Sequence, residues 1–172
     1  MKKFIATFCL IISIVQVYAQ SPIEVGQKQL NAGFGFSNYG LPVYVGLDYC
    51  FMDDVTLGGE FSYRSYNDEF FGAKYNHKLI GFLVNGNYHF NTLLDIPSEY
   101  DIYGGLNIGF YTLSSPDGYP GNKNSGLGLG LQIGARYYFN DSFGVNLELT
   151  GGNNLTGRSG ASGGKIGVSV KF

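Results

Sequence analysis

Eight stretches of the chain alternate between apolar side chains and polar or small ones. Successive side chains of a β-strand point to opposite sides, so an alternation with period two predicts strands with two different faces. None of the apolar positions in these stretches holds a charged residue or an amide. The stretches cover residues 29–36, 43–51, 55–64, 79–90, 100–111, 127–139, 143–151 and 164–172.

The lengths of the stretches and of their connections indicate a membrane-spanning arrangement. Most stretches are 9–13 residues long, the length that a tilted strand needs to cross a bilayer. Tight turns at 52–54 and 140–141 alternate with longer polar connections at 65–78, 112–126 and 152–163. Short periplasmic turns and longer extracellular loops are typical of outer-membrane barrels. The connection 37–42 is shorter, and 91–99 longer, than this scheme requires.

The volume of the apolar face decides which way it points. About 38 bulky apolar side chains would have to enter an eight-stranded barrel whose interior ordinary side chains only just fill. The opposite face is rich in glycine and fits that narrow interior. Only 14% of the residues are charged, against about a quarter in soluble domains. We therefore predict a closed antiparallel up-and-down transmembrane β-barrel with its apolar face toward lipid.

Aromatic residues cluster at the expected strand ends, and the mid-strand outward residues are mainly aliphatic. Two aromatic belts around an aliphatic band are typical of membrane barrels. A soluble sandwich or a secreted ligand-binding barrel would also alternate, with its apolar face inward. Its solvent face would be expected to carry more charge and less glycine, so it remains an alternative.

The first 19 residues have the features of a cleaved signal peptide. Two lysines precede an apolar run from Phe4 to Val17, and Ala19 offers a small residue at the cleavage site. Residues 20–172 would then form the barrel domain. Only Cys50 remains in that domain, so no internal disulfide is possible. We expect Cys50 to be a small interior filler.

The closing stretch 164–172, Gly-Lys-Ile-Gly-Val-Ser-Val-Lys-Phe, ends in an aromatic residue. In this stretch and in its overall pattern, the chain resembles the small OmpA/OmpX-type eight-stranded outer-membrane barrels, especially the outer membrane protein beta-barrel domain family. The resemblance implies a bacterial outer-membrane location, contact with membrane lipid and lipopolysaccharide, and a barrel-assembly machinery that reads Phe172 as a signal. It implies no activity.

Four acids and four bases fall on the inward face of the stretches. Isolated charges in a narrow barrel are costly, so we expect them to pair and to plug the lumen. Strand neighbours favour Glu60, Arg136 and Glu148 as mid-barrel residues. A small pore remains an alternative. The predicted plug comprises Asp48, Glu60, Arg64, Asp101, Arg136, Glu148, Lys165 and Lys171.

Catalytic and metal chemistry have little support. Of the two histidines, His89 is expected to face inward and His77 to lie in an outer loop, and we predict no metal site and no cofactor. A lipid-modifying enzyme, a further alternative, would need a lipid-facing His–Ser pair. The predicted outward face lacks such a pair, so no catalytic residue is assigned. The net charge of −2 gives no basic field for nucleic acid.

The outer connections hold exposed aromatic residues over a rigid scaffold, which makes them candidate contact residues. Self-packing of the loops or contact with lipopolysaccharide is the competing interpretation. We expect a monomer with a structural or surface-interaction role. The candidate contacts are Phe70, Phe71, Tyr75 and Tyr119.

Overall fold

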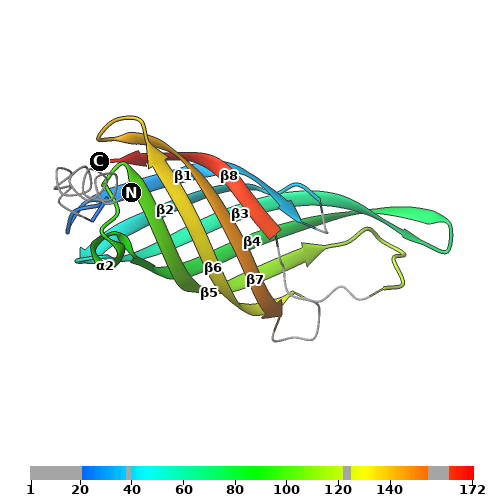
Figure 1. The fold of residues 1–172 in the computed structure, drawn as a ribbon. Coiled ribbons are helices and arrows are strands. Elements are labelled where there is room, and N and C mark those ends of the chain that lie inside the picture. Colours follow the sequence, from blue (N-terminus) through cyan, green and yellow to red (C-terminus); the bar gives the residue numbers. More distant parts are fainter. Residues whose placement is uncertain (1–20, 38–39, 122–124, 155–162) are drawn as a thin grey trace, which may run out of the picture.

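The computed structural model describes residues 21–37, 40–121, 125–154 and 163–172, so the predicted signal peptide, residues 1–19, lies outside the described residues. Eight antiparallel strands close into a barrel in sequence order, with the last strand paired to the first (Figure 1). The strands are β1 (Lys28–Ser37), β2 (Val43–Met52), β3 (Val55–Phe70), β4 (Ala73–His89), β5 (Tyr100–Ser114), β6 (Gly126–Tyr138), β7 (Phe143–Asn154) and β8 (Gly163–Lys171).

The predicted fold class is confirmed, and all eight predicted stretches form strands. Each stretch lies inside its strand, except that three of them run one residue too far, to Phe90, Phe139 and Phe172. The closing pair aligns Ala32 with Val168. Closure pairs every strand on both sides, which a membrane-spanning sheet requires because lipid offers no hydrogen-bond partners.

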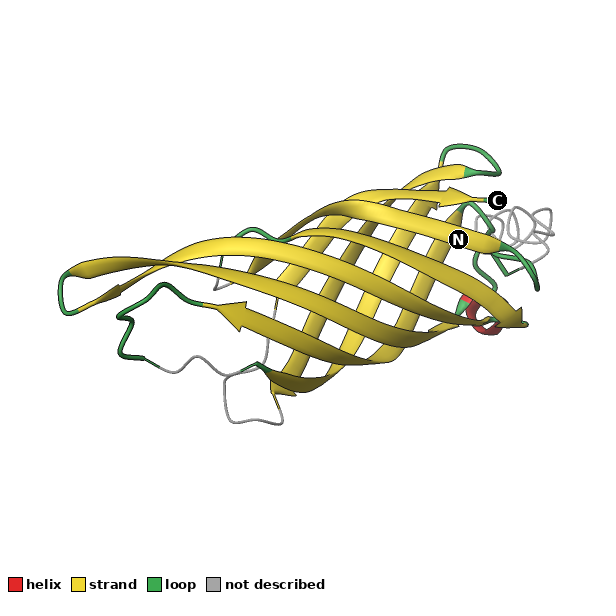
Figure 2. Cartoon of the chain, turned by 180° about the vertical axis from the view of Figure 1, so that it is seen from behind, coloured by secondary structure: helices red, strands yellow, loops and turns green. Residues whose placement is uncertain are grey.

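Strands β3 and β4 are longer than the alternation predicts. The connection 65–78 was expected to be a loop, but it is a β-hairpin paired as far as Phe70 with Ala73. Figure 2 shows this hairpin projecting beyond the other strands. Its turn places Phe71 and Gly72 at positive φ, 50° and 78°. We name residues 65–78 the outer arm.

The opposite end of the barrel carries the short turns and both ends of the described chain (Figure 1). At the β6–β7 turn, the Asn140 side-chain oxygen accepts hydrogen bonds from the backbone N–H groups of Ser142 and Phe143. The connection 91–99, which is longer than the predicted scheme requires, contains a short helix, α2 (Asn91–Leu94). In the orientation predicted from the sequence the short turns face the periplasm, so we call this the periplasmic end. No described helix is both long and apolar enough to cross a membrane.

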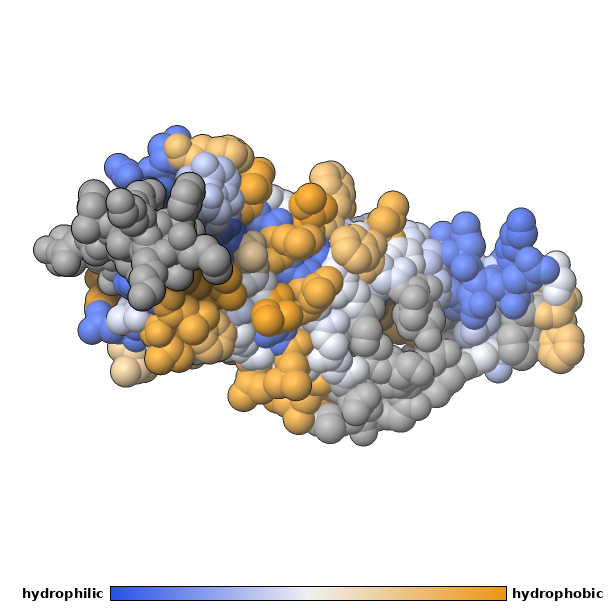
Figure 3. Space-filling model, in the orientation of Figure 1, coloured by the Kyte–Doolittle hydropathy of each residue, from blue (hydrophilic) through white to orange (hydrophobic). Residues whose placement is uncertain are grey.

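The apolar face points outward. Leu47 and Val168 are 45% and 40% exposed, and Leu106 and Leu131 are each 65% exposed. Figure 3 shows apolar residues, in orange, over the strands on the face that it displays. Four residues that would be buried together in a soluble barrel therefore lie on the outside.

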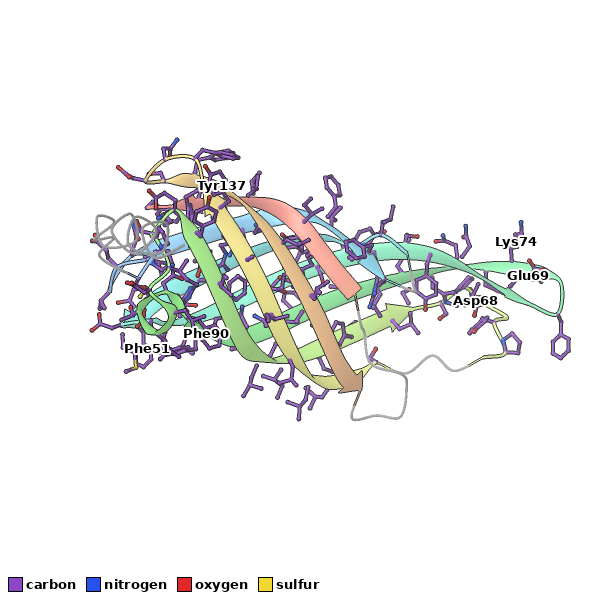
Figure 4. All side chains as sticks on the ribbon, in the orientation of Figure 1. Phe51, Asp68, Glu69, Lys74, Phe90 and Tyr137 are labelled. Carbon is purple, nitrogen blue, oxygen red and sulfur yellow. The ribbon has the colours of Figure 1, made fainter. Side chains whose placement is uncertain are left out.

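Aromatic rings line the periplasmic end of this band. Tyr137 contacts Tyr100 and Phe139, with ring centroids 5.1 and 5.3 Å apart, and Phe139 stacks on Phe143 at 5.9 Å. Tyr137, Phe51 and Phe90 all lie near this end in Figure 4. Aromatic rings of membrane proteins are expected in such a girdle, at the depth of the lipid headgroups.

Candidate functional site: the polar lumen

All eight residues of the predicted plug lie on the inward positions of their strands. Six of them are buried, and Glu60 and Lys165 are of intermediate exposure. The structure brings six of the eight into two separate ion-pair clusters. The other two, Arg64 and Lys171, donate hydrogen bonds to a hydroxyl and to a backbone oxygen.

The periplasmic cluster is built around Arg136 on β6. Its guanidinium donates to Asp101 on the neighbouring β5 at 2.6 Å and to Asp48 on β2, across the lumen, at 3.3 Å. It also lies 3.9 Å from the ring centroid of Tyr103. Arg136 was expected at mid-barrel, but it sits two residues before the periplasmic end of β6. It holds opposite walls of the barrel together.

Asp101 also accepts a second partner from β4. His89 Nδ1 lies 2.7 Å from Asp101, and His89 Nε2 lies 3.1 Å from the Thr56 hydroxyl. The three groups follow the hydroxyl–imidazole–carboxylate order of a hydrolase triad. All three are at most 1% exposed, and Arg136 occupies the other oxygen of Asp101. With the hydroxyl enclosed, the arrangement is a structural hydrogen-bond chain.

The second cluster is built around Lys165 on β8. Its ammonium group donates to Glu60 on β3 and to Glu148 on β7, both at 2.7 Å. Glu60 and Glu148, two of the three residues favoured at mid-barrel, therefore share one cation. Tyr103 joins this cluster from β5, because its hydroxyl donates to Glu148 at 2.9 Å.

Tyrosines that the sequence analysis did not single out span the lumen. The Tyr44 hydroxyl on β2 donates to Asn146 on β7 at 2.7 Å, and Tyr138 on β6 hydrogen-bonds Gln29 on β1. Both tyrosines, like Tyr103, occupy inward positions of the alternation, which was the available signal. They were missed because tyrosine was assigned to the lipid-facing belts.

Glycines beneath these side chains make the packing possible. A Cβ atom at Gly134 on β6 would overlap the Tyr103 ring, and one at Gly58 on β3 would overlap the Asp48 carboxylate. The inward glycines therefore provide room for long polar side chains from neighbouring strands.

Arg64 and Lys171 sit near opposite ends of the lumen. Arg64 donates to the Ser37 hydroxyl at 2.8 Å. Lys171 donates to the backbone oxygen of Pro22 at 2.7 Å and lies 3.8 Å from the Tyr138 ring centroid. Cys50 is fully buried and inward, as expected of an interior filler.

The outer half of the lumen contains a cleft of about 550 Å³, including the part open to solvent. Two residues of the second cluster, Glu60 and Lys165, line it together with both apolar and polar side chains. The lining includes Phe36, Pro42, Tyr44, Glu60, Arg64, Leu83, Tyr111 and Lys165.

The outer arm buries an aromatic cluster against the β5–β6 connection. Tyr119 contacts Tyr75 and His77, with ring centroids 5.0 and 4.5 Å apart, and its hydroxyl donates to Asp68 at 3.0 Å. His77 was expected in a loop, but it is a buried residue of β4 stacked on Tyr66. Tyr119 was expected to be exposed and is only 7% exposed.

Of the four candidate contacts, Phe71 is 96% exposed at the tip of the arm. Tyr75 belongs to the aromatic cluster, and Phe70 is the last residue of β3. Among the described residues, no three His, Cys, Asp or Glu side chains are placed to hold a metal ion. Both histidines are buried, so neither lies on the lipid-facing surface where the lipid-modifying alternative needs one.

Comparison with solved structures identifies proteins of the same architecture. The N-terminal β-barrel domain of Pseudomonas aeruginosa OprF matches with a TM-score of 0.63 and 19% identity, over 86% of this chain and 98% of that one. The P. aeruginosa outer membrane protein OprG matches with a TM-score of 0.68 and 12% identity, over 89% and 99%. Neisserial surface protein A matches with a TM-score of 0.58 and 19% identity, over 85% and 95%.

No family model and no curated protein sequence matches the chain. The structural likeness concerns the fold, and the location follows from the fold together with the exposed apolar band. A closed barrel with a lipid-compatible exterior and polar interior is a structure that can span a bilayer. The chain therefore has the fold of the small eight-stranded outer-membrane β-barrels, with an exterior suited to lipid.

Proposed function

We propose that the protein is a non-conducting outer-membrane barrel that acts as a rigid scaffold for the outer arm. The observation that carries this proposal is the pair of ion-pair clusters, around Arg136 and Lys165, which link strands across the lumen. An eight-stranded barrel leaves little interior space. Salt bridges that occupy this space leave ions no continuous path.

Conductance in planar bilayers tests the closed lumen. The wild-type barrel should give no steady single-channel current, and a variant with Arg136→Gly and Lys165→Gly together should give one. A steady current from the wild type would refute the closed lumen and favour the small-pore alternative.

The outer arm is the proposed interaction element. Its aromatic cluster stiffens a hairpin that extends about 20 Å beyond Tyr63 at ~3.3 Å per residue. The arm presents Phe71, and bulky residues at positive φ are rare and concentrate at functional positions. We infer that Phe71 makes contacts, that Phe70 contributes to the same tip, and that Tyr75 and Tyr119 mainly support the arm.

A shortened arm tests this role. Replacing residues 66–77 by a two-residue Asn-Gly turn should leave a folded barrel, because the membrane-spanning pairs of β3 and β4 remain. Intact bacterial cells that display the barrel with the shortened arm should be retained severalfold less on bacterial or epithelial monolayers than cells that display the wild type. Unchanged retention would remove the interaction role from the arm.

Export and assembly complete the proposal. We infer cleavage after Ala19, which a mature-protein mass beginning at Gln20 would establish. We also infer that the monomeric barrel is inserted by the barrel-assembly machinery through β8 and the exposed Phe172. Phe172→Ala should lower the amount of folded protein in the outer membrane, and an unchanged amount would contradict this role.

A further inference from the structure

The segment before β1 turns back toward the barrel. The Gln27 N–H donates to the Glu24 oxygen at 2.9 Å, and Gly26 has a φ of +90°. The same turn is fixed to the end of β2, because Gly26 and Gln27 exchange backbone hydrogen bonds of 2.8 and 3.0 Å with Cys50. The residues before the turn are therefore directed at the periplasmic mouth.

Two inward side chains hold those preceding residues. The Lys171 ammonium group of β8 donates to the Pro22 oxygen at 2.7 Å, and the Cys50 sulfur of β2 lies 3.5 Å from the Ile23 oxygen. Since both side chains point into the lumen, Pro22 and Ile23 lie on its inner side. The start of the described chain lies at this end in Figure 1.

The burial of neighbouring apolar residues supports insertion. Ile23 is 1% exposed, whereas Val25, two residues later, is 56% exposed. An aliphatic side chain is otherwise misplaced at this mouth, where the inward residues Lys171 and Gln29 are polar and buried. Its burial removes apolar surface from water, and the Cys50 thiol, whose sulfur lies 3.5 Å from the Ile23 backbone oxygen, is 0% exposed.

We propose that residues 21–24 form a cork that closes the periplasmic mouth, and that Ile23 is the inserted residue. The cork is distinct from the ion-pair clusters above it. It shields the single thiol of residues 20–172 in a compartment where exposed thiols are oxidised. The inference rests on the inserted barrel but not on a non-conducting lumen.

Labelling of Cys50 tests the cork in the full chain, folded in lipid vesicles. The probe is a maleimide attached to a polyethylene glycol chain, which is too bulky to cross the lumen from the outer side. Ile23→Asp should be labelled at least tenfold faster than the wild type, and Ile23→Ala should be labelled at an intermediate rate. Val25→Asp is the matched control and should keep the wild-type rate.

Each variant is first checked for the gel mobility of the folded barrel. If Ile23→Asp does not fold, the labelling rate of Ile23→Ala is compared with that of Val25→Asp, and this comparison tests the cork. Equal labelling rates for the Ile23 variants and the wild type would overturn the proposal, as would wild-type labelling as fast as in urea. A conducting wild-type barrel with slow Cys50 labelling would refute the closed lumen and leave the cork in place.

Discussion

Replacing Arg136 by methionine should strongly destabilise the barrel. The side chain is 3% exposed and neutralises two carboxylates, Asp101 and Asp48. Breaking a buried ion pair by removing one partner costs about 3–5 kcal/mol. Asp101 would keep His89 at 2.7 Å, and Asp48 would keep the Asn31 amide at 2.8 Å. We therefore expect a loss at the lower end, about 3 kcal/mol in the free energy of unfolding.

The assay is urea unfolding in lipid vesicles, followed by the mobility of unboiled samples on gels. Adding Asp48→Asn to Arg136→Met removes the carboxylate that is left without a cation, and should recover about half of the loss. Lys74→Met, on the exposed face of the outer arm, is the control and should change the free energy by less than about 0.5 kcal/mol. If the free energy of unfolding of Arg136→Met lies within that same range of the wild-type value, the proposed stabilising role of the cluster is refuted.

Three further substitutions test other parts of the structure. Gly134→Ala should lower the free energy of unfolding by about 1–3 kcal/mol, because the new methyl group overpacks against Tyr103. Gly151→Ala, with nothing within 4 Å of the new Cβ, should be neutral in the same urea assay. Equal effects of the two substitutions would contradict the packing. Leu131→Arg should cost about 2–4 kcal/mol in vesicles and Tyr49→Arg, at the periplasmic interface, about 0–1; no dependence on depth would argue against the lipid-facing band. Tyr119→Phe loses the hydrogen bond to Asp68. The rate at which trypsin cleaves the outer arm should therefore rise about fivefold, equivalent to ~1 kcal/mol. An unchanged cleavage rate would show that this bond does not hold the arm.

The membrane-spanning part of the fold was predictable because lipid imposes one strict rule on the outward face. Each outward position such as Leu106 or Leu131 has to be apolar, so the alternation is clear. In the outer arm both faces leave the membrane, and outward positions such as Asn67 and Asn76 are polar. The signal disappears there although the backbone pairing continues to Phe70 and Ala73.

The charged residues of the lumen were also predictable, but their partners were not. Alternation places Arg136 and Asp48 on the same inner face without indicating that β6 and β2 stand opposite each other with these residues at one height. Whether two such residues meet across the lumen depends on the stagger of all the strands around the barrel. The cork was missed because a strand pattern says nothing about an irregular segment, whose position is revealed by its hydrogen bonds and by the burial of Ile23 in the structure.

Spin labels in a Cys50→Ser background test the central claim most directly, because they report which medium surrounds a side chain. With the barrel in lipid vesicles, a nitroxide at Leu131 should collide more with oxygen, which concentrates in hydrocarbon, than with a water-soluble nickel chelate. A nitroxide at Asn76 on the outer arm should show the reverse preference. Stronger collision with the nickel chelate at Leu131 would contradict the lipid-facing band, and with it the membrane-spanning barrel.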